Sequence, residues 1–262
     1  MTRVASFEIN HTRLLNPDGS PAGELPSFAQ DKEAVVTLYR SMVLTRTFDA
    51  KAVALQRTGR MGTFASSLGQ EAVTTGIAAA MTPNDVLAPS FREQGALLWR
   101  GVTIEENLLY WGGDNRGSTY KNVREDFPIS VPVGSHAPHA VGVAMAMKLR
   151  GEKRAAVCVF GDGATSKGDV YEAMNLAGVW KVPVIFVVTN NQWAISVPRE
   201  GQTAAKTFAQ KALAAGFDGE QVDGNDVFAM RHVMGEALAR AQRLSPAPDR
   251  GDHLPPRRPH HR

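Results

Sequence analysis

The residues with the clearest chemical potential follow two apolar runs in the middle of the chain. AAVCVF ends at Gly161-Asp162-Gly163, VIFVVT ends at Asn190-Asn191, and 26 residues separate Gly163 from Asn190. Two strands joined by one helical crossover lie parallel, with their carboxyl ends side by side. Asp162 and Asn191 are therefore expected to meet there. A carboxylate and an amide oxygen on glycine-flanked turns predict a site for a hard cation and a phosphorylated ligand.

The segment between the two turns, GDVYEAMNLAGVW, has the apolar spacing of a helix that covers a sheet. Four of its side chains are expected to face that sheet: Val170, Met174, Ala177 and Val179. Three residues stand at its amino end: Ala164, Thr165 and Ser166. Free backbone N–H groups and the helix dipole favour a phosphate at such an end. Either turn alone is more often structural, but the two together, each at a strand end, are far more specific.

Strands and helices alternate along the rest of the chain. Helices are expected over 31–59 (as one or two segments), 68–81, 92–100, 103–111, 136–151, 204–216 and 225–243. Asn225 is the expected cap of the last helix. Strands are expected over 86–90 and 219–224, and loops over 112–130 and 192–204. This alternation predicts an α/β fold, a doubly wound, mostly parallel sheet with helices on both faces.

Composition and charge exclude several classes of protein. The chain has no run of 18 apolar residues, so no membrane span is expected. The N-terminus lacks an apolar signal segment, and we expect a cytoplasmic protein. The net charge of +3 lies in the last 20 residues, so the neutral body has no electrostatic footprint for nucleic acid. The single cysteine, Cys158, stands in an apolar run and is expected to pack rather than react.

The spacing from Gly-Asp-Gly to Asn-Asn resembles the thiamine diphosphate motif. Further stretches are similar, in order, to the alpha subunit of the first component of 2-oxo acid dehydrogenase complexes, of the pyruvate and branched-chain type. They are GRMGTFASSLGQEA, SFREQG, ISVPVGSHAPHA, QTAAKTFAQKALAAG and QVDGNDVFA. The resemblance covers roughly residues 20–243. It implies a thiamine diphosphate-binding fold that uses thiamine diphosphate and Mg²⁺.

The resemblance also implies a ligand set, position by position. Mg²⁺ would be bound by the Asp162 carboxylate, the Asn191 amide oxygen and the Trp193 backbone carbonyl. Seven residues complete the cofactor site: Phe91, Arg92, Val131, Val133, Gly161, Gly163 and Ala164. Gly163 and Ala164 would offer N–H groups to the diphosphate, and the backbones of Val131 and Val133 would contact the aminopyrimidine. The Arg92 guanidinium suits a phosphate oxygen pair. Phe91 replaces a tyrosine usual in the family, so that hydroxyl contact is lost or passes to water or Ser90.

By the same resemblance, the activity is oxidative decarboxylation of a small 2-oxo acid, followed by acyl transfer to a lipoyl group on the acyltransferase of the complex. The partner is a beta subunit, in an assembly of two alpha and two beta chains, and it supplies the glutamate that activates the aminopyrimidine. Pyruvate is the favoured substrate, and branched-chain 2-oxo acids and acetoin are the alternatives. His136 and His139 are expected to be cap or packing residues, and no catalytic residue is assigned in this chain.

Three segments are expected: an extended arm over 1–30, the thiamine diphosphate-binding α/β domain over 31–243, and a disordered tail over 244–262. The tail holds five prolines and no apolar periodicity. Family members have a strand and a loop histidine at this point, and we expect the tail to be encoded out of frame, so that the domain is incomplete. The alternative function is therefore a truncated, inactive partner of the beta subunit.

Overall fold

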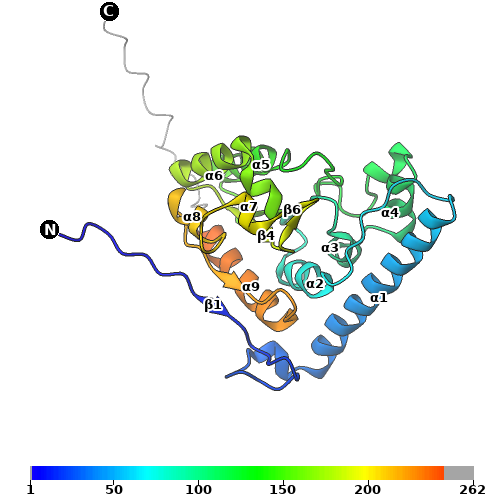
Figure 1. The fold of residues 1–262 in the computed structure, drawn as a ribbon, viewed down its shortest axis with the longest axis horizontal. Helices are drawn as coiled ribbons and strands as arrows, with labels where there is room; N and C mark the ends of the chain where they lie inside the picture. The colour runs from blue at the N-terminus through cyan, green and yellow to red at the C-terminus, as the bar shows by residue number, and fades with distance from the viewer. Residues whose placement is uncertain (1, 245–262) are drawn as a thin grey trace, which may run out of the picture.

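A computed structural model of the chain describes residues 2–244 (Figure 1). The helices are α1 (Lys32–Arg57), α2 (Glu71–Ala80), α3 (Gln94–Arg100), α4 (Ile104–Trp111), α5 (Ala137–Arg150), α6 (Gly168–Trp180), α7 (Arg199–Gln202), α8 (Gln210–Ala214) and α9 (Val227–Arg243). The strands are β1 (His11–Thr12), β2 (Val86–Ala88), β3 (Ala156–Gly161), β4 (Val184–Thr189), β5 (Trp193–Ala194), β6 (Val197–Pro198) and β7 (Gln221–Val222). Three short 3-10 helices complete the structure: η1 (Ser27–Gln30), η2 (Asn115–Ser118) and η3 (Asp162–Ser166).

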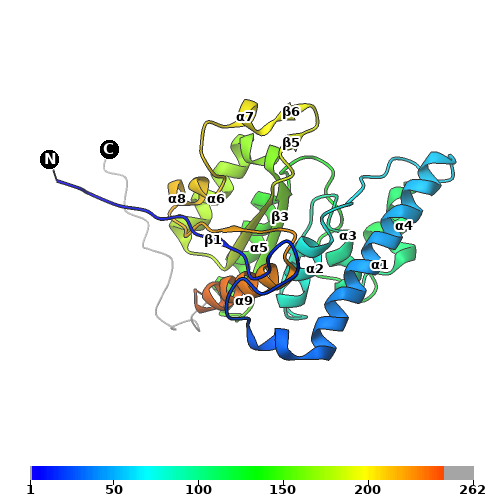
Figure 2. The ribbon, with the colours of Figure 1, turned by 60° about the horizontal axis from the view of Figure 1, so that its bottom comes forward.

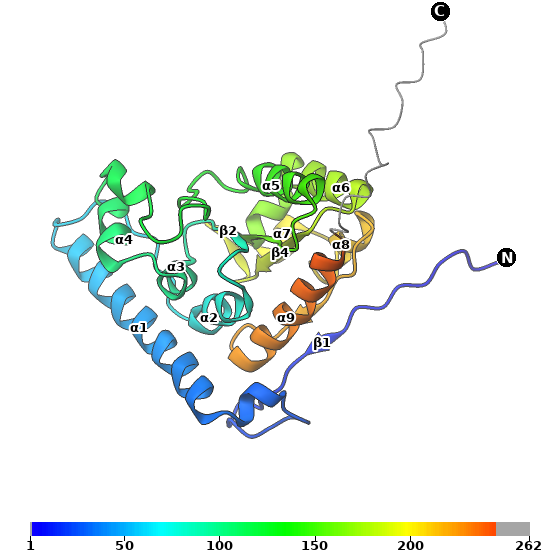
Figure 3. The same cartoon turned by 180° about the vertical axis from the view of Figure 1, so that it is seen from behind.

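The central sheet is parallel, in the order β2-β3-β4, and helices cover both of its faces. Alternate residues of β3 point to opposite sides. Cys158 and Phe160 pack with α5 and α6, whereas Val157 and Val159 pack with α2, α3 and α9. Figure 3 shows α5 and α6 side by side, with α1, α2 and α3 grouped away from them. The prediction of a doubly wound α/β fold with a mostly parallel sheet is confirmed.

Helix α2 and helix α9 approach closely on one side of the sheet because of a glycine. A Cβ atom at Gly76 would lie 2.5 Å from the Cβ of Met230. Such a distance is far below van der Waals contact, so only glycine permits this helix crossing. The small residues of α2 therefore have a specific neighbour in α9.

The structure corrects the sequence prediction at Val179 and in the loop over 192–204. Val179 is 70% exposed rather than facing the sheet, because the buried positions of α6 (Val170, Met174 and Ala177) follow the helical period and Val179 lies off it. The loop expected over 192–204 contains the β5–β6 hairpin and α7, which Figure 2 shows together at one end of the molecule.

The cap of α9 is Asp226, not Asn225. Its Oδ1 accepts hydrogen bonds from the backbone N–H groups of Phe228 and Ala229, at 2.9 and 3.0 Å. Its Oδ2 accepts from the N–H groups of Leu14 and Leu15, both at 2.7 Å. One carboxylate therefore caps the helix and also fixes the N-terminal arm, which runs beside α9 in Figure 1. The expected strand over 219–224 pairs with this arm, as β7 with β1, and not with the central sheet.

Strand β4 pairs only with β3, and its outer edge is open within residues 2–244. Its six residues are all half-buried, in contrast to the buried β2. The open edge faces a groove of about 1350 Å³, which β7 and α9 also line. Across the described part of the chain, no helix combines the length and apolar character needed to cross a bilayer. The predicted tail lies outside the described residues, except for Leu244, which follows α9 as its C-cap.

Candidate functional site

The Gly-Asp-Gly turn and the Asn-Asn turn lie together at the carboxyl ends of β3 and β4. In the parallel ladder Gly161 is paired with Thr189, so Asp162 and Asn190 are the next residues on neighbouring strands. Strands in such a pair are about 4.8 Å apart. The chain then turns back, and a Cβ atom at Gly163 would lie 2.7 Å from the Cβ of Ala194. The structure therefore brings the Gly-Asp-Gly turn against the β5–β6 hairpin that follows Asn191.

Asp162 is the buried carboxylate of this site, at 1% exposure. Its Oδ2 accepts a hydrogen bond of 2.9 Å from Nε2 of Gln202, in α7. Its backbone oxygen accepts one of 2.7 Å from the Thr165 hydroxyl. Both the side chain and the backbone of Asp162 are therefore fixed by neighbours. The residues predicted to bind a phosphate, Gly163 and Ala164, stand in the first turn of η3. A 3-10 helix that begins at Asp162 leaves the N–H of Gly163 without a helical partner, whereas that of Ala164 faces the carbonyl of Gly161.

The asparagine pair forms a tight turn after β4. The side-chain oxygen of Asn190 accepts from the N–H of Gln192 at 3.0 Å, and that of Asn191 accepts from the N–H of Trp193 at 3.1 Å. Gln192 adopts a positive φ of 70°, a conformation unusual for a residue with a side chain. These turns present the asparagine oxygens and the Trp193 side chain at the surface.

The donor set suits a hard cation. In the region that the structure describes, no group of three or more His, Cys, Asp or Glu side chains could bind a metal. A metal at this site would therefore depend on the single carboxylate of Asp162, supplemented by amide and carbonyl oxygens. Mg²⁺ is commonly bound by one or two carboxylates together with phosphate oxygens and water. The residues present fit that cation once a phosphorylated ligand supplies further oxygens.

Arg92 follows β2, on the other side of β3 from Asn191. Its guanidinium lies over the ring of Phe91, with 5.4 Å between Cζ and the ring centroid, and donates to the carbonyl oxygen of Ser66. Phe91 has no hydroxyl to offer a phosphate, but it supports Arg92 through a cation–π contact. The neighbouring Glu93 is buried, and burial raises the pKa of its carboxyl to about 7.

The segment with Val131 and Val133 reaches the same end of the sheet from the start of α5. Gly134 has a φ of 73°, and a Cβ atom there would lie 2.7 Å from Cγ2 of Val170, so the turn packs directly on α6. The side chains of Val131 and Val133 are exposed, as are those of Trp193 and Ile195 on the β5–β6 hairpin. Ile195 is 99% exposed. We call these four residues the apolar rim.

His136 and Cys158 are packing residues, as predicted. His136 is 2% exposed, its Nε2 lies 2.8 Å from the carbonyl oxygen of Val159, and its ring packs edge-on against Phe160. Burial lowers the pKa of His136, so the ring is neutral at pH 7 and its Nε2 is the donor. Cys158 is fully buried, and burial raises the pKa of its thiol. His139 lies exposed on α5.

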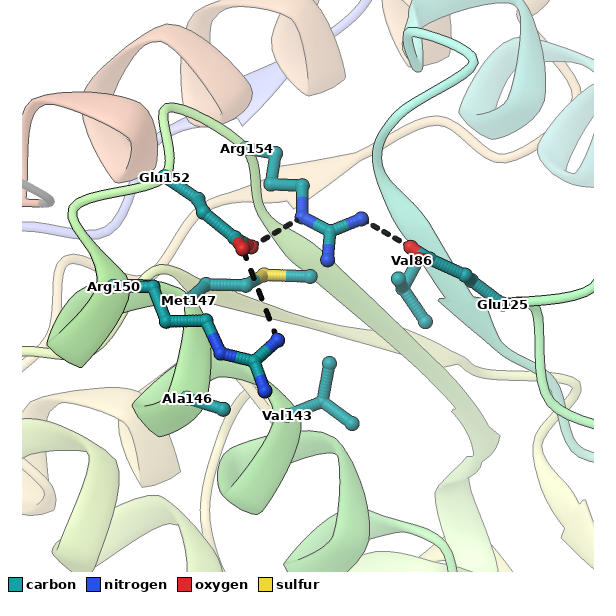
Figure 4. A pocket seen from close by; sticks show the side chains of 8 residues that line it. All are labelled: Val86, Glu125, Val143, Ala146, Met147, Arg150, Glu152 and Arg154. Carbon is teal, nitrogen blue, oxygen red and sulfur yellow. Dashed lines mark hydrogen bonds and ion pairs between the residues drawn. The ribbon is translucent and has the colours of Figure 1, made fainter.

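A second cavity, of about 240 Å³, lies at the opposite end of the sheet (Figure 4). Its walls include Val86, the first residue of β2, and a chain of ion pairs in which Arg154 binds both Glu125 and Glu152. Ligands of open α/β sheets bind at the carboxyl ends of the strands. This cavity is therefore separate from the site of Asp162.

Sequence reasoning missed two residues that hold the Gly-Asp-Gly turn. Gln202 binds the carboxylate of Asp162, and the ammonium of Lys211 donates to both the carbonyl and the hydroxyl oxygen of Thr165, at 2.9 Å each. Both lie in the stretch QTAAKTFAQKALAAG, which was matched to the family without a role for any residue. No spacing rule predicts that α7 and α8 fold back onto η3.

Comparison with solved structures places the fold. The chain is similar to transketolase from Leishmania mexicana, with a TM-score of 0.60, over 76% of this chain and 34% of that one. At 18% sequence identity this likeness concerns the fold alone. It agrees with the α/β fold class predicted from the sequence.

The chain belongs to the Dehydrogenase E1 component family, whose sequence model matches residues 39–246. It is 43% identical over 241 residues to 3-methyl-2-oxobutanoate dehydrogenase subunit alpha of Mycobacterium tuberculosis, covering 91% of this chain and 65% of that protein. It is also 43% identical over 212 residues to pyruvate dehydrogenase E1 component subunit alpha of Acholeplasma laidlawii, covering 81% and 61%. The chain spans less than two thirds of the length of both relatives. The predicted family is thus confirmed.

Proposed function

We propose that the chain is the alpha component of a thiamine diphosphate-dependent 2-oxo acid dehydrogenase. The observation that carries the proposal is the meeting of Asp162, buried and fixed, with the Asn191 turn at the carboxyl ends of two parallel strands. Pyruvate is the proposed substrate, and a branched-chain 2-oxo acid is the second candidate because relatives named for each are equally identical to this chain.

In this proposal the chain's own residues bind and orient the cofactor. Asp162, Asn191 and the Trp193 carbonyl hold Mg²⁺, and the N–H groups of Gly163 and Ala164 face the diphosphate. Arg92, supported by Phe91, adds a charge-assisted hydrogen bond to a phosphate oxygen. When bound, thiamine diphosphate supplies the thiazolium carbon that attacks the ketone of the 2-oxo acid. Asp162 needs no proton transfer for its part, since its role is to fix the cation.

The proposal includes a beta subunit that covers the apolar rim. All four residues of the apolar rim are exposed. They lie on two loops that both approach η3, through Gly134 and through Ala194, and exposed apolar patches mark interaction surfaces. A partner on this rim would exclude water from the reacting end of the cofactor. The proposed assembly contains two alpha and two beta chains, and the acyl product passes to a lipoyl group on an acyltransferase.

Isothermal titration with thiamine diphosphate, with and without Mg²⁺, tests the cofactor site on this chain. We expect saturable binding that requires Mg²⁺ and is lost in Asp162→Ala. Decarboxylation of pyruvate and of 3-methyl-2-oxobutanoate by the chain with a beta subunit tests activity and substrate. Binding without turnover of either acid supports the alternative function, an inactive partner of the beta subunit. No binding under any condition refutes the cofactor site.

A further inference from the structure

Lys211 is a buried cation whose contacts the proposed function does not explain. It lies in α8, with 9% of its surface exposed. Within residues 2–244, no carboxylate lies within the 4.0 Å that defines an ion pair with its Nζ. Burying an ammonium without a counter-charge is strongly unfavourable unless other groups stabilise it. Other groups must therefore stabilise the buried ammonium of Lys211.

The neighbours of Lys211 fix the ammonium in one place. It donates to the carbonyl and hydroxyl oxygens of Thr165, both at 2.9 Å. It also lies 5.1 Å from the ring centroid of Tyr171 and 5.5 Å from that of Phe208, within the range of cation–π attraction. Oxygen dipoles and aromatic faces thus replace a carboxylate, and they leave the positive charge unneutralised.

Two successive hydrogen bonds connect Lys211, through Thr165, to Asp162. The Thr165 hydroxyl accepts from Lys211 and donates its own proton to the backbone oxygen of Asp162 at 2.7 Å. Asp162 is held at its carboxylate by Gln202, from α7. The segment that bears α7 and α8 therefore holds η3 at two points. The Lys211 contact occupies the carbonyl and hydroxyl oxygens of Thr165 and involves no backbone N–H group of η3.

We propose that Lys211 is a positioning residue for the η3 turn and supplies the buried positive charge that favours a diphosphate there. This inference rests on the proposed function for its ligand, a diphosphate with a divalent cation, but not for its effect on η3. Groups that support a metal-binding residue from the next layer change metal affinity about 10- to 100-fold when mutated. Lys211 is separated from Asp162 by Thr165 alone, so an effect of that size is expected.

The test compares Lys211→Met with Lys206→Met in the full chain. Methionine keeps the length and the packing against Tyr171 and Phe208 but removes the charge. Lys206 is exposed in the same segment, so its variant matches the change in net charge. Titration with Mg²⁺ and thiamine diphosphate should show about 10- to 100-fold weaker binding for Lys211→Met and a change below about twofold for Lys206→Met. Mg²⁺ with inorganic diphosphate should show the same ratio, because the effect acts on the diphosphate.

Hydrogen exchange without any ligand separates this inference from the proposed function. The amides that donate within η3, and that of Lys167, which donates to the Ala164 carbonyl oxygen at 3.1 Å, should exchange about tenfold faster in Lys211→Met. This is a loss of the order expected for one charged hydrogen bond, and β3 and α9 should keep their rates. Unchanged exchange in η3, or uniformly faster exchange throughout, overturns the positioning role. If the wild-type chain binds no diphosphate, the proposed function fails, and the exchange experiment still decides the role of Lys211. Thr165→Val provides a second variant, expected to weaken binding and accelerate the same amides with Lys211 intact.

Discussion

Replacing Gly163 with alanine should move the β5–β6 hairpin away from the Gly-Asp-Gly turn without unfolding the chain. The new Cβ atom would lie 2.7 Å from the Cβ of Ala194 and 3.6 Å from its Cα. Carbon atoms in contact are about 3.5–4.0 Å apart, so the β5–β6 hairpin must retreat by about 1 Å. The hairpin contains Trp193, whose carbonyl is one of the proposed ligands. A displacement of this size at a positioned group reduces function about 100-fold.

The expected result is therefore a loss of about 100-fold in affinity for Mg²⁺ and thiamine diphosphate, or roughly 2.7 kcal/mol. Stability should change little, because β5 and β6 are two-residue strands outside the central sheet. Isothermal titration measures the affinity, and a thermal melt measures the stability.

Gly168→Ala is the matched control, since no atom lies within 4 Å of its added Cβ and the residue begins a helix. It should leave the affinity unchanged. The reasoning is refuted if Gly163→Ala binds the cofactor as tightly as the wild type. That result would mean either that the hairpin moves freely or that Trp193 is not a ligand.

Four further predictions follow from single contacts. Arg92→Ala should weaken thiamine diphosphate binding by about 10- to 100-fold, because a charge-assisted hydrogen bond contributes about 1.5–3 kcal/mol. An unchanged affinity in the titration would exclude Arg92 from the site. Because burial raises the pKa of Glu93 to about 7, the folded state binds its proton more tightly than the unfolded state, and stability should fall as pH rises from 4.5 to 7. The loss should approach roughly 3 kcal/mol in urea unfolding, and Glu93→Gln should remove that slope. Gly76→Ala should destabilise the chain by about 1–3 kcal/mol through overpacking against Met230, whereas Gly235→Ala, with no atom within 4 Å, should not. The open edge of β4 should make the chain self-associate as its concentration rises, and light scattering from a monomer at every concentration would contradict this.

The sequence predicts the positions of the main elements because their signals are local. The apolar runs before Asp162 and Asn191 are the buried or half-buried strands β3 and β4, and the crossover between them is α6. The doubly wound sheet follows from that alternation. The cap of α9 could not be chosen from sequence alone, because Asn225 and Asp226 are both good capping residues. Asp226 prevails since its second oxygen also binds the N-terminal arm, a contact 211 residues away in the chain.

The candidate site also contains residues that the sequence predicts and residues that only the tertiary structure reveals. The turns that contain Asp162 and Asn191 have a fixed spacing, and the parallel ladder brings them together. Gln202 and Lys211 act from α7 and α8, whose short helices have no periodicity strong enough to fix their orientation. Their contacts with η3 depend on how the whole segment after the hairpin folds back, which is a tertiary property. Sequence patterns identify the ligands of such a site more readily than the groups that hold the ligands in place.

The site combines a buried polar half with an exposed apolar half, and this contrast is informative about mechanism. Asp162 and Lys211 are buried and held by several hydrogen bonds within the chain, so the proposed diphosphate site needs little reorganisation. Val133, Trp193 and Ile195 are exposed at the same end of the sheet, where an aromatic or apolar ligand surface would remain in contact with water. A preorganised electrostatic site is effective only where water is excluded. In the proposed function, the chain therefore binds the charged part of the cofactor by itself, and a second protein surface closes over the rim to shield the reacting part.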